Sequence, residues 1–198
     1  SAVPSPVLTH YILTSPLGHL LLAGRGGWLS GLWFVGERHC PEVSESVPRL
    51  MLPTRVDIAE QSAVFDGLPP FVEATCRWVS AYFSCTLSLP PLPDMEWRGT
   101  DFQLAVWREL LTVPFGQTLT YGALAARVAA RMGRPSPAIR AVATAVGRNP
   151  ISILVPCHRI VGARGAVGGY AGGVARKLEL LALEGVLFVE IENCFCAK

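Results

Sequence analysis

The chain has 198 residues, 51% of them hydrophobic, and a formal net charge of +2. No apolar run approaches the roughly 18 residues that a membrane span needs. The N-terminus lacks a charged segment followed by an apolar one, so we expect neither a signal peptide nor a membrane anchor. The six cysteines are irregularly spaced, which argues against a secreted disulfide scaffold.

The first half of the chain is predicted to form a small antiparallel meander followed by one helix. Strands are indicated at residues 8–14, 20–23 and 28–35, with turns between them. We expect residues 1–7 to be a loose tail and residues 36–56 a surface excursion. The apolar face of the helix that opens at Pro69-Pro70 comprises Phe71, Val72, Ala74, Trp78, Val79, Tyr82 and Phe83. The prolines at 90–93 are expected to end this helix, which places a domain boundary near residue 95.

The second half is predicted to be mainly helical. Asp101 is a candidate N-cap or first-turn acid for a helix that stops at Pro114-Phe115-Gly116. Thr120 is expected to cap a helix over residues 121–130. Ser136-Pro137 resembles an N-cap and first position for a helix over residues 138–146, with Gly147 as its C-cap. Two short helices joined by a turn form a helix-turn-helix pattern, which is compatible with DNA binding.

Positive charge is concentrated in one stretch of the chain. From residue 127 to residue 176 there are no acidic residues, and the basic ones are Arg127, Arg131, Arg134, Arg140, Arg148, Arg159, Arg164 and Arg176. A field of one sign attracts a polyanion. A solvated basic face without a partner is the alternative.

Cys157 is the candidate nucleophile. It lies in the run Pro156-Cys157-His158-Arg159-Ile160-Val161, after the apolar residues 151–155, which predict a buried strand or a buried turn. Neighbouring positive charge or a hydrogen-bonded base gives a thiol a route to the reactive thiolate. The alternative is a buried, inert cysteine. Neither His39-Cys40 nor the pair Cys194 and Cys196 has further ligands at zinc-finger spacing, so we expect no metal.

A set of separate motifs, in order, resembles the O6-alkylguanine-DNA alkyltransferases, also called methylated-DNA–protein-cysteine methyltransferases. The resemblance covers residues 98–186 closely. The motifs are Phe102-Gln103 with Val106-Trp107, Pro114-Phe115-Gly116, Tyr121-Gly122, residues 138–142 (AIRAV), Asn149-Pro150, residues 156–161 (PCHRIV), residues 169–173 (GYAGG) and residues 181–185 (LALEG).

The resemblance implies an α+β fold in two domains with a tail. It implies a ribonuclease-H-like domain and linker over residues 1–95. A winged helix-turn-helix, DNA-binding alkyltransferase domain would follow over residues 96–187, and a tail over residues 188–198. It implies an intracellular monomer, cytoplasmic or nuclear according to its source, with no cofactor and no membrane partner.

The implied activity is direct reversal of DNA damage. The resemblance implies that an O6-alkylguanine is flipped out of double-stranded DNA through the minor groove, with O4-alkylthymine as a second candidate lesion. The alkyl group would then move irreversibly to Cys157 in a single turnover. In the reactive centre, His158 would be the base through a bound water, Glu184 would orient His158, Asn149 would hold the turn, and Tyr121 would donate a proton to the leaving base.

The resemblance also implies residues that bind the substrate and DNA. Arg140 would replace the flipped base, and Ala141 and Thr144 would lie on the recognition helix. Tyr170 and Ala171 would close over O6. The carbonyl groups of Val155 and Cys157 would read the exocyclic amine. Ile160 and Arg164 complete the predicted contact set, whereas Arg159 is expected to be a structural charge.

Three further hypotheses remain at this stage. A non-catalytic, lesion-sensing DNA-binding protein would share the fold, although such proteins replace the acceptor cysteine that is present here. A cysteine hydrolase would use Cys157 and His158 with turnover. The arginines of residues 131–136 would add phosphate contacts and steepen the salt dependence of DNA binding.

Overall fold

The computed structural model describes residues 7–52, 65–86 and 88–186. The chain divides into two compact units, one formed by residues 1–36 and 40–97 and the other by residues 37–39 and 98–198. The tripeptide at 37–39 therefore belongs with the C-terminal unit although its sequence neighbours belong to the N-terminal one. The predicted tail at 188–198, with Cys194 and Cys196, lies outside the described residues.

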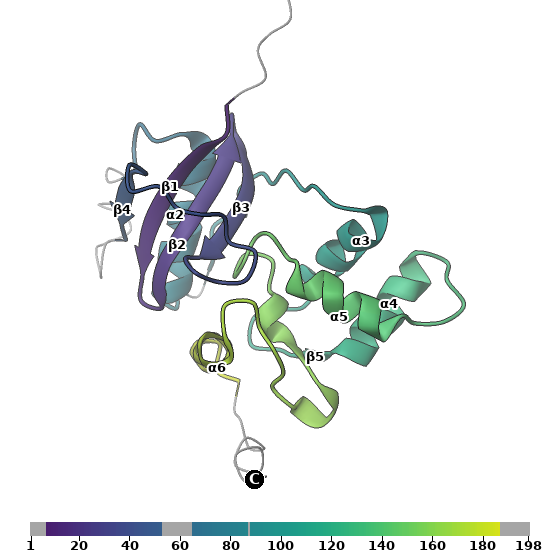
Figure 1. Ribbon diagram of the computed structural model, residues 1–198. Coiled ribbons are helices and arrows are strands. Elements are labelled where there is room, and N and C mark those ends of the chain that lie inside the picture. The colour runs from purple at the N-terminus through teal and green to yellow at the C-terminus, as the bar shows by residue number, and fades with distance from the viewer. Residues whose placement is uncertain (1–6, 53–64, 87, 187–198) are drawn as a thin grey trace, which may run out of the picture. The chain divides into compact units, whose positions relative to one another are not determined.

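The N-terminal unit is a four-stranded sheet with one helix packed on it (Figure 1). Strands β1 (Thr9–Ser15), β2 (Gly18–Arg25) and β3 (Trp28–Phe34) are antiparallel neighbours, and β4 (Arg49–Met51) pairs parallel to β1, giving the order β3-β2-β1-β4. Helix α2 (Pro70–Phe83) has proline at its first position, where the missing N–H has no intrahelical partner to lose.

Two details of this unit differ from the sequence prediction. The predicted surface excursion at 36–56 contains β4, whose pairing with β1 depends on residues distant in sequence. Helix α2 ends at Phe83, before the prolines at 90–93, with Ser84 as its C-cap. The side chains of Phe71, Val72, Trp78, Val79 and Tyr82 are buried, as the apolar face predicted.

The C-terminal unit is built mainly from short helices. Its elements are α3 (Asp101–Leu110), β5 (Leu119–Thr120), α4 (Tyr121–Arg131), α5 (Ile139–Gly147), η1 (Cys157–Arg159), β6 (Ile160–Val161), η2 (Ala163–Gly165) and α6 (Val174–Leu183). Strands β5 and β6 form a two-stranded parallel ladder, and α3, α4 and α5 pack on one another. A small sheet together with several helices confirms the predicted α+β class.

Helix caps account for the element boundaries. Thr120 accepts a hydrogen bond from the Ala123 N–H and begins α4, as predicted. Thr100, and not Asp101, is the N-cap of α3, in a capping box with Gln103; Asp101 is the first-turn acid.

The predicted caps of α5 were wrong at both ends. Its N-cap is Ala138, without a side-chain hydrogen bond, and Ser136 lies outside the helix. The helix begins at Ile139, two residues after Pro137, so Ser136 is too far from its first turn to cap it. Gly147 is the last helical residue, and Arg148 is the C-cap.

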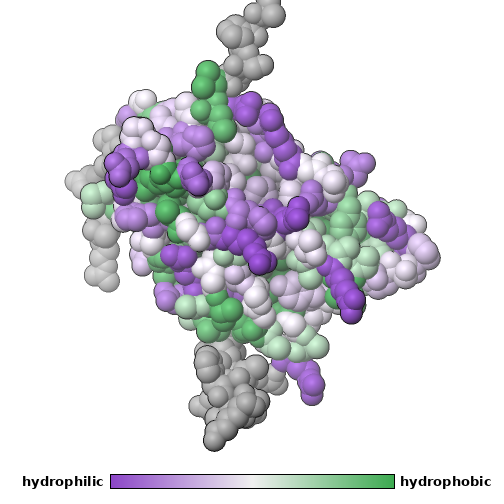
Figure 2. All heavy atoms as spheres, viewed as in Figure 1, coloured by the Kyte–Doolittle hydropathy of each residue, from purple (hydrophilic) through white to green (hydrophobic). Residues whose placement is uncertain are grey.

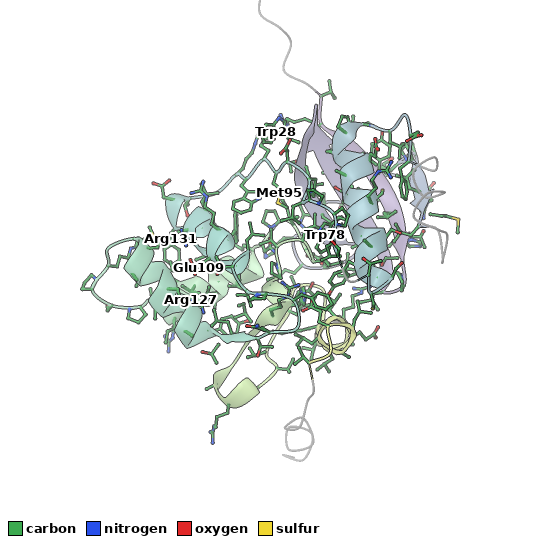
Figure 3. All side chains as sticks on the ribbon, turned by 180° about the vertical axis from the view of Figure 1, so that it is seen from behind. Trp28, Trp78, Met95, Glu109, Arg127 and Arg131 are labelled. Carbon is green, nitrogen blue, oxygen red and sulfur yellow. The ribbon has the colours of Figure 1, made fainter. Side chains whose placement is uncertain are left out.

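Two interactions fix the helices around the helix-turn-helix pattern. The indole N–H of Trp107 on α3 donates to the carbonyl of Ala145 on α5, at 2.9 Å. Glu109, on α3, lies beside Arg127 and Arg131 of α4 (Figure 3). Its carboxylate is 2.8 Å from the Arg131 guanidinium and 3.9 Å from that of Arg127. The buried carboxylate of Glu109 is thus neutralised by two arginines whose side chains are half exposed.

Within the described residues, no helix is long and apolar enough to cross a bilayer.

Candidate active site

A buried turn places Cys157. Residues 151–155, predicted as a strand or a turn, form a turn in which every residue is buried and Ile153 has a φ of 69°. The Asn149 side chain holds this turn: its Nδ2 donates to the carbonyl of Val155 at 2.8 Å, and its Oδ1 accepts from the Ile151 N–H at 3.0 Å. The same Nδ2 lies 3.2 Å from the Cys157 Sγ. Asn149 therefore links the shape of the turn to the position of the thiol.

The thiol of Cys157 is protonated at neutral pH. Burial raises its pKa to about 11, and the charge of Glu37 adds to the increase, whereas the Asn149 hydrogen bond and the charge of Lys177 act in the opposite direction. Of the two predicted routes to a thiolate, positive charge or a hydrogen-bonded base, Arg159 does not supply the first, because it binds Glu184 and the Val113 carbonyl. A proton must leave Cys157 before its sulfur can act as a strong nucleophile.

His158 and Glu184 form a buried pair. The His158 Nε2 lies 2.7 Å from Glu184 Oε1, and neither side chain is exposed to solvent. Burial alone would raise the pKa of Glu184, but hydrogen bonds from His158 and Arg159 lower it to about 2. The Gly116 N–H also donates to this carboxylate, at 3.1 Å. Arg159, as predicted from its position, is a structural charge.

This pairing fixes the tautomer of His158. Burial lowers the pKa of His158, so the ring is neutral at pH 7. An ionised Glu184 can only accept, so Nε2 carries the proton and Nδ1 keeps a lone pair. Nδ1 is buried and has no hydrogen-bond partner within the part of the chain that the structure describes. It is therefore a base with its acceptor site available.

A cavity of about 410 Å³ opens on Cys157. Two tyrosines form part of its wall, Tyr121 from the start of α4 and Tyr170 from the glycine-rich segment, and Ala171 lies beside them. Burial, with a smaller contribution from Cys157, raises the pKa of Tyr121, so its hydroxyl remains a proton donor at neutral pH. The remaining lining residues are Arg38, Ala143, Val146, Gly147 and Gly169.

The exposed face of α5 carries a separate set of predicted residues. Arg140, Ala141 and Thr144 are exposed, and the opposite face buries Val142, Ala145 and Val146. Figure 2 shows hydrophilic side chains projecting among weakly hydrophobic ones over this part of the molecule. The structure thus places Cys157 and a cavity against one side of α5, whose other side is exposed.

Known proteins with similar sequences carry out a reaction at a cysteine. The profile of the family "6-O-methylguanine DNA methyltransferase, DNA binding domain" matches residues 101–186. A methylated-DNA–protein-cysteine methyltransferase of Mycobacterium tuberculosis is 39% identical over 178 residues, which are 89% of this chain and 93% of that protein. The chain belongs to this methyltransferase family. A relative from Mycobacterium leprae with the same name is 40% identical over 172 residues, 87% of this chain and 89% of that protein.

Solved structures give the same result. The crystal structure of the Mycobacterium tuberculosis enzyme OGT in complex with DNA has a TM-score of 0.68 and 36% identity to this chain, covering 89% of this chain and 93% of that one. As a member of the family, the protein is a methylated-DNA–protein-cysteine methyltransferase of DNA repair.

Three predicted contact residues of the methyltransferase have surroundings that the sequence did not indicate. The Val155 carbonyl already accepts hydrogen bonds from Asn149 Nδ2 and from the Cys157 N–H. The Ile160 side chain is fully buried, and its carbonyl accepts from Lys177 Nζ. Arg164 is exposed in η2 with a φ of 57°. The first two residues could reach a substrate only through their backbones.

Sequence reasoning missed Lys177. The side chain is fully buried, and burial lowers its pKa to about 8. Its charge lowers the pKa of Cys157. The sequence does contain a pattern that indicates its burial. One helix face, with i, i+3, i+4, i+7 spacing, is formed by Lys177, Leu180, Leu181 and Glu184. A lysine at that spacing in an apolar helix face predicts a buried cation.

Proposed function

We propose that this methyltransferase repairs O6-alkylguanine in double-stranded DNA by moving the alkyl group to Cys157, once per protein molecule. The observation that carries this proposal is the arrangement of the Cys157 thiol in a cavity with two tyrosines, next to a neutral histidine held by an ionised Glu184. The cavity has room for a flipped base, and the thiol is kept unreactive until a substrate arrives.

The proposed reaction begins with the thiol proton. His158 Nδ1 takes this proton through one water, and Glu184 stabilises the imidazolium that forms. The sulfur then bonds to the alkyl carbon while the bond from that carbon to O6 breaks. Tyr121 supplies a proton to the leaving guanine. The thioether product contains no bond that water can hydrolyse readily, so a single turnover follows and no cofactor is needed.

The proposed DNA-binding surface is the exposed face of α5. Arg140 would enter the duplex where the base leaves, with Ala141 and Thr144 beside it in the minor groove. Exposed Arg164 would contact a phosphate. The DNA complex of the Mycobacterium tuberculosis relative supports DNA as the partner.

The proposal also covers the fold class of each unit, the set of lesions that are repaired and the oligomeric state. We assign the N-terminal unit to the ribonuclease-H-like class and the C-terminal unit to the winged helix-turn-helix class. Tyr170 and Ala171, which line the cavity, close over O6. In the proposal, the backbones of Val155 and Ile160 border the base. O4-alkylthymine is a second substrate, and the protein acts as an intracellular monomer.

Intact mass spectrometry tests the proposal. The protein is incubated with a duplex that contains one O6-methylguanine, beside the Cys157→Ser variant. We expect the wild type to gain one methyl group per molecule, mapped to the Cys157 peptide, and the variant to gain none. Retained DNA binding without a mass change would refute the proposal and favour a lesion-sensing protein. Several methyl groups released per protein molecule would favour a hydrolase.

A further inference from the structure

A tripeptide from outside the alkyltransferase motifs contributes to the Cys157 cavity. Residues 37–39 follow β3 in the sequence but belong to the C-terminal unit. The Arg38 N–H donates to the carbonyl of Ala171 at 3.2 Å, and the Arg38 side chain lines the cavity. Arg38 therefore reaches the cavity beside the segment that carries Tyr170 and Ala171.

The position of this tripeptide is fixed from both sides. Gly36 and His39, which flank Glu37 and Arg38, have φ angles of 85° and 69°, so the backbone is left-handed on each side of the pair. The Glu37 carboxylate is buried and accepts a hydrogen bond from the Ser152 Oγ at 3.0 Å. Because Glu37 is anchored to the turn that precedes Cys157, the backbone of Arg38 is held beside the cavity, which its exposed side chain lines.

Arg38 brings a charge that the proposed methyl transfer does not require. All the other residues that line the cavity are uncharged. Across residues 7–52, 65–86 and 88–186, no carboxylate lies within ion-pair distance of the Arg38 guanidinium. Glu37 does not neutralise it, since its carboxylate is bound to Ser152 and is absent from the lining. O6-methylguanine is neutral, so its alkyl group offers this cation no counter-charge.

We propose that Arg38 is a specificity residue that favours O6-alkyl groups carrying a negative charge, of which carboxymethyl is the simplest. This inference rests on the proposed function, in which Tyr170 and Ala171 close over O6. The backbone N–H of Arg38 is bonded to the Ala171 carbonyl, so Arg38 then lies near the alkyl group on O6. A guanidinium pairs with a carboxylate through two parallel hydrogen bonds, which gives geometric as well as electrostatic selection.

The chemistry of the transfer is unchanged. The Cys157 sulfur bonds to the methylene carbon of the carboxymethyl group, and the bond from that carbon to O6 breaks, with its electron pair going to the guanine. The thiol proton leaves through His158, and the guanine takes up one proton. The products are S-carboxymethylcysteine and guanine, so atoms and electrons balance. Arg38 binds the carboxylate throughout and does not take part in bond changes.

Two duplexes and three variants test the role of Arg38. Single-turnover transfer rates are measured by intact mass with O6-methylguanine and O6-carboxymethylguanine in the same sequence. We expect Arg38→Gln to lower the carboxymethyl rate about tenfold and the methyl rate less than about twofold. Arg38→Lys should restore part of the carboxymethyl rate, since it keeps the charge without the planar fork. Arg49→Gln, which removes the same charge from exposed β4, is the control and should change neither rate.

Two results would overturn the role of Arg38 as a specificity residue. Equal losses on both substrates, together with a weaker salt dependence, would mean that Arg38 contacts a DNA phosphate instead of the alkyl group. Unchanged rates in Arg38→Gln would mean that the guanidinium does not contact the carboxylate. If the wild type transferred neither alkyl group, the proposed function itself would fail. A melting temperature matching that of the wild type would confirm that Arg38→Gln is folded.

Discussion

Replacing Glu184 with glutamine removes one charge from the centre of the buried network. The carboxylate accepts hydrogen bonds from His158, from two nitrogens of Arg159 and from the Gly116 N–H. Lowering its pKa from 4.5 to about 2 corresponds to about 3 kcal/mol of folding free energy. The cost of leaving a buried charge without its partner, here Arg159, is about 3–5 kcal/mol. We therefore expect Glu184→Gln to lower the free energy of unfolding by about 3 kcal/mol at pH 7.

The pH dependence of this loss has a definite sign. Because the pKa of Glu184 is lower in the folded state, its contribution is fully present above about pH 5 and disappears as the pH falls toward about 2. The wild type and Glu184→Gln should therefore differ at pH 7 and converge in acid. The transfer rate at pH 7 should fall about 100-fold, since a glutamine NH₂ can donate to His158 and reverse its tautomer.

Urea unfolding followed by tryptophan fluorescence measures the first effect, and intact mass measures the second. Glu179→Gln is the matched control, because Glu179 is exposed on α6, the helix whose C-cap is Glu184. A Glu184→Gln protein within about 1 kcal/mol of the wild type at pH 7 would refute the electrostatic reasoning. So would a stability difference that persisted unchanged at pH 2.

Three further predictions concern neighbouring groups. In the protein without DNA at pH 8, iodoacetamide should modify buried Cys157 far more slowly than exposed Cys85, and peptide mapping measures both rates. Comparable rates would contradict the raised pKa of Cys157. Asn149→Ala should cost about 2 kcal/mol in urea unfolding and slow the transfer, and a fully stable variant would mean that the turn holds without this side chain. Arg131→Ala should lower the free energy of unfolding by about 1 kcal/mol, because it leaves the buried Glu109 carboxylate without its nearer cation. The same variant should leave the salt dependence of DNA binding unchanged. A shallower salt dependence would favour a contact between Arg131 and a DNA phosphate.

The last of these predictions concerns the basic stretch. The sequence hypothesis gave Arg131 and Arg134 to DNA phosphates, since eight arginines occur without an acidic residue between 127 and 176. In the structure, Arg131 pairs with Glu109, and the Arg134 guanidinium lies 5.0 Å from the centre of the Phe102 ring. Both partners come from α3, which precedes the basic stretch. A local count of charge could not reveal acids and aromatic rings supplied by another helix.

The sequence by itself determined those features that depend on a few adjacent residues. Thr120 caps α4 through an N–H three residues away, and Pro70 starts α2 because its ring suits a first helical turn. The order of the motifs around Cys157 identified the family. By contrast, the caps of α5 were predicted wrongly, because the helix begins at Ile139 and ends at Gly147, so Ala138 and Arg148 occupy the cap positions.

Only the tertiary structure decided the charge state and the surroundings of the thiol. The pKa of Cys157 depends on how deeply it is buried and on Glu37 and Lys177, which the fold brings near it. Ser152 and Glu37, which touch, are 115 residues apart in the chain. Local propensity acts over one or two helical turns, whereas burial and Coulomb forces depend on distance in space. For that reason the reactive cysteine could be found from the sequence, but its protonation and the arginine at its cavity could not.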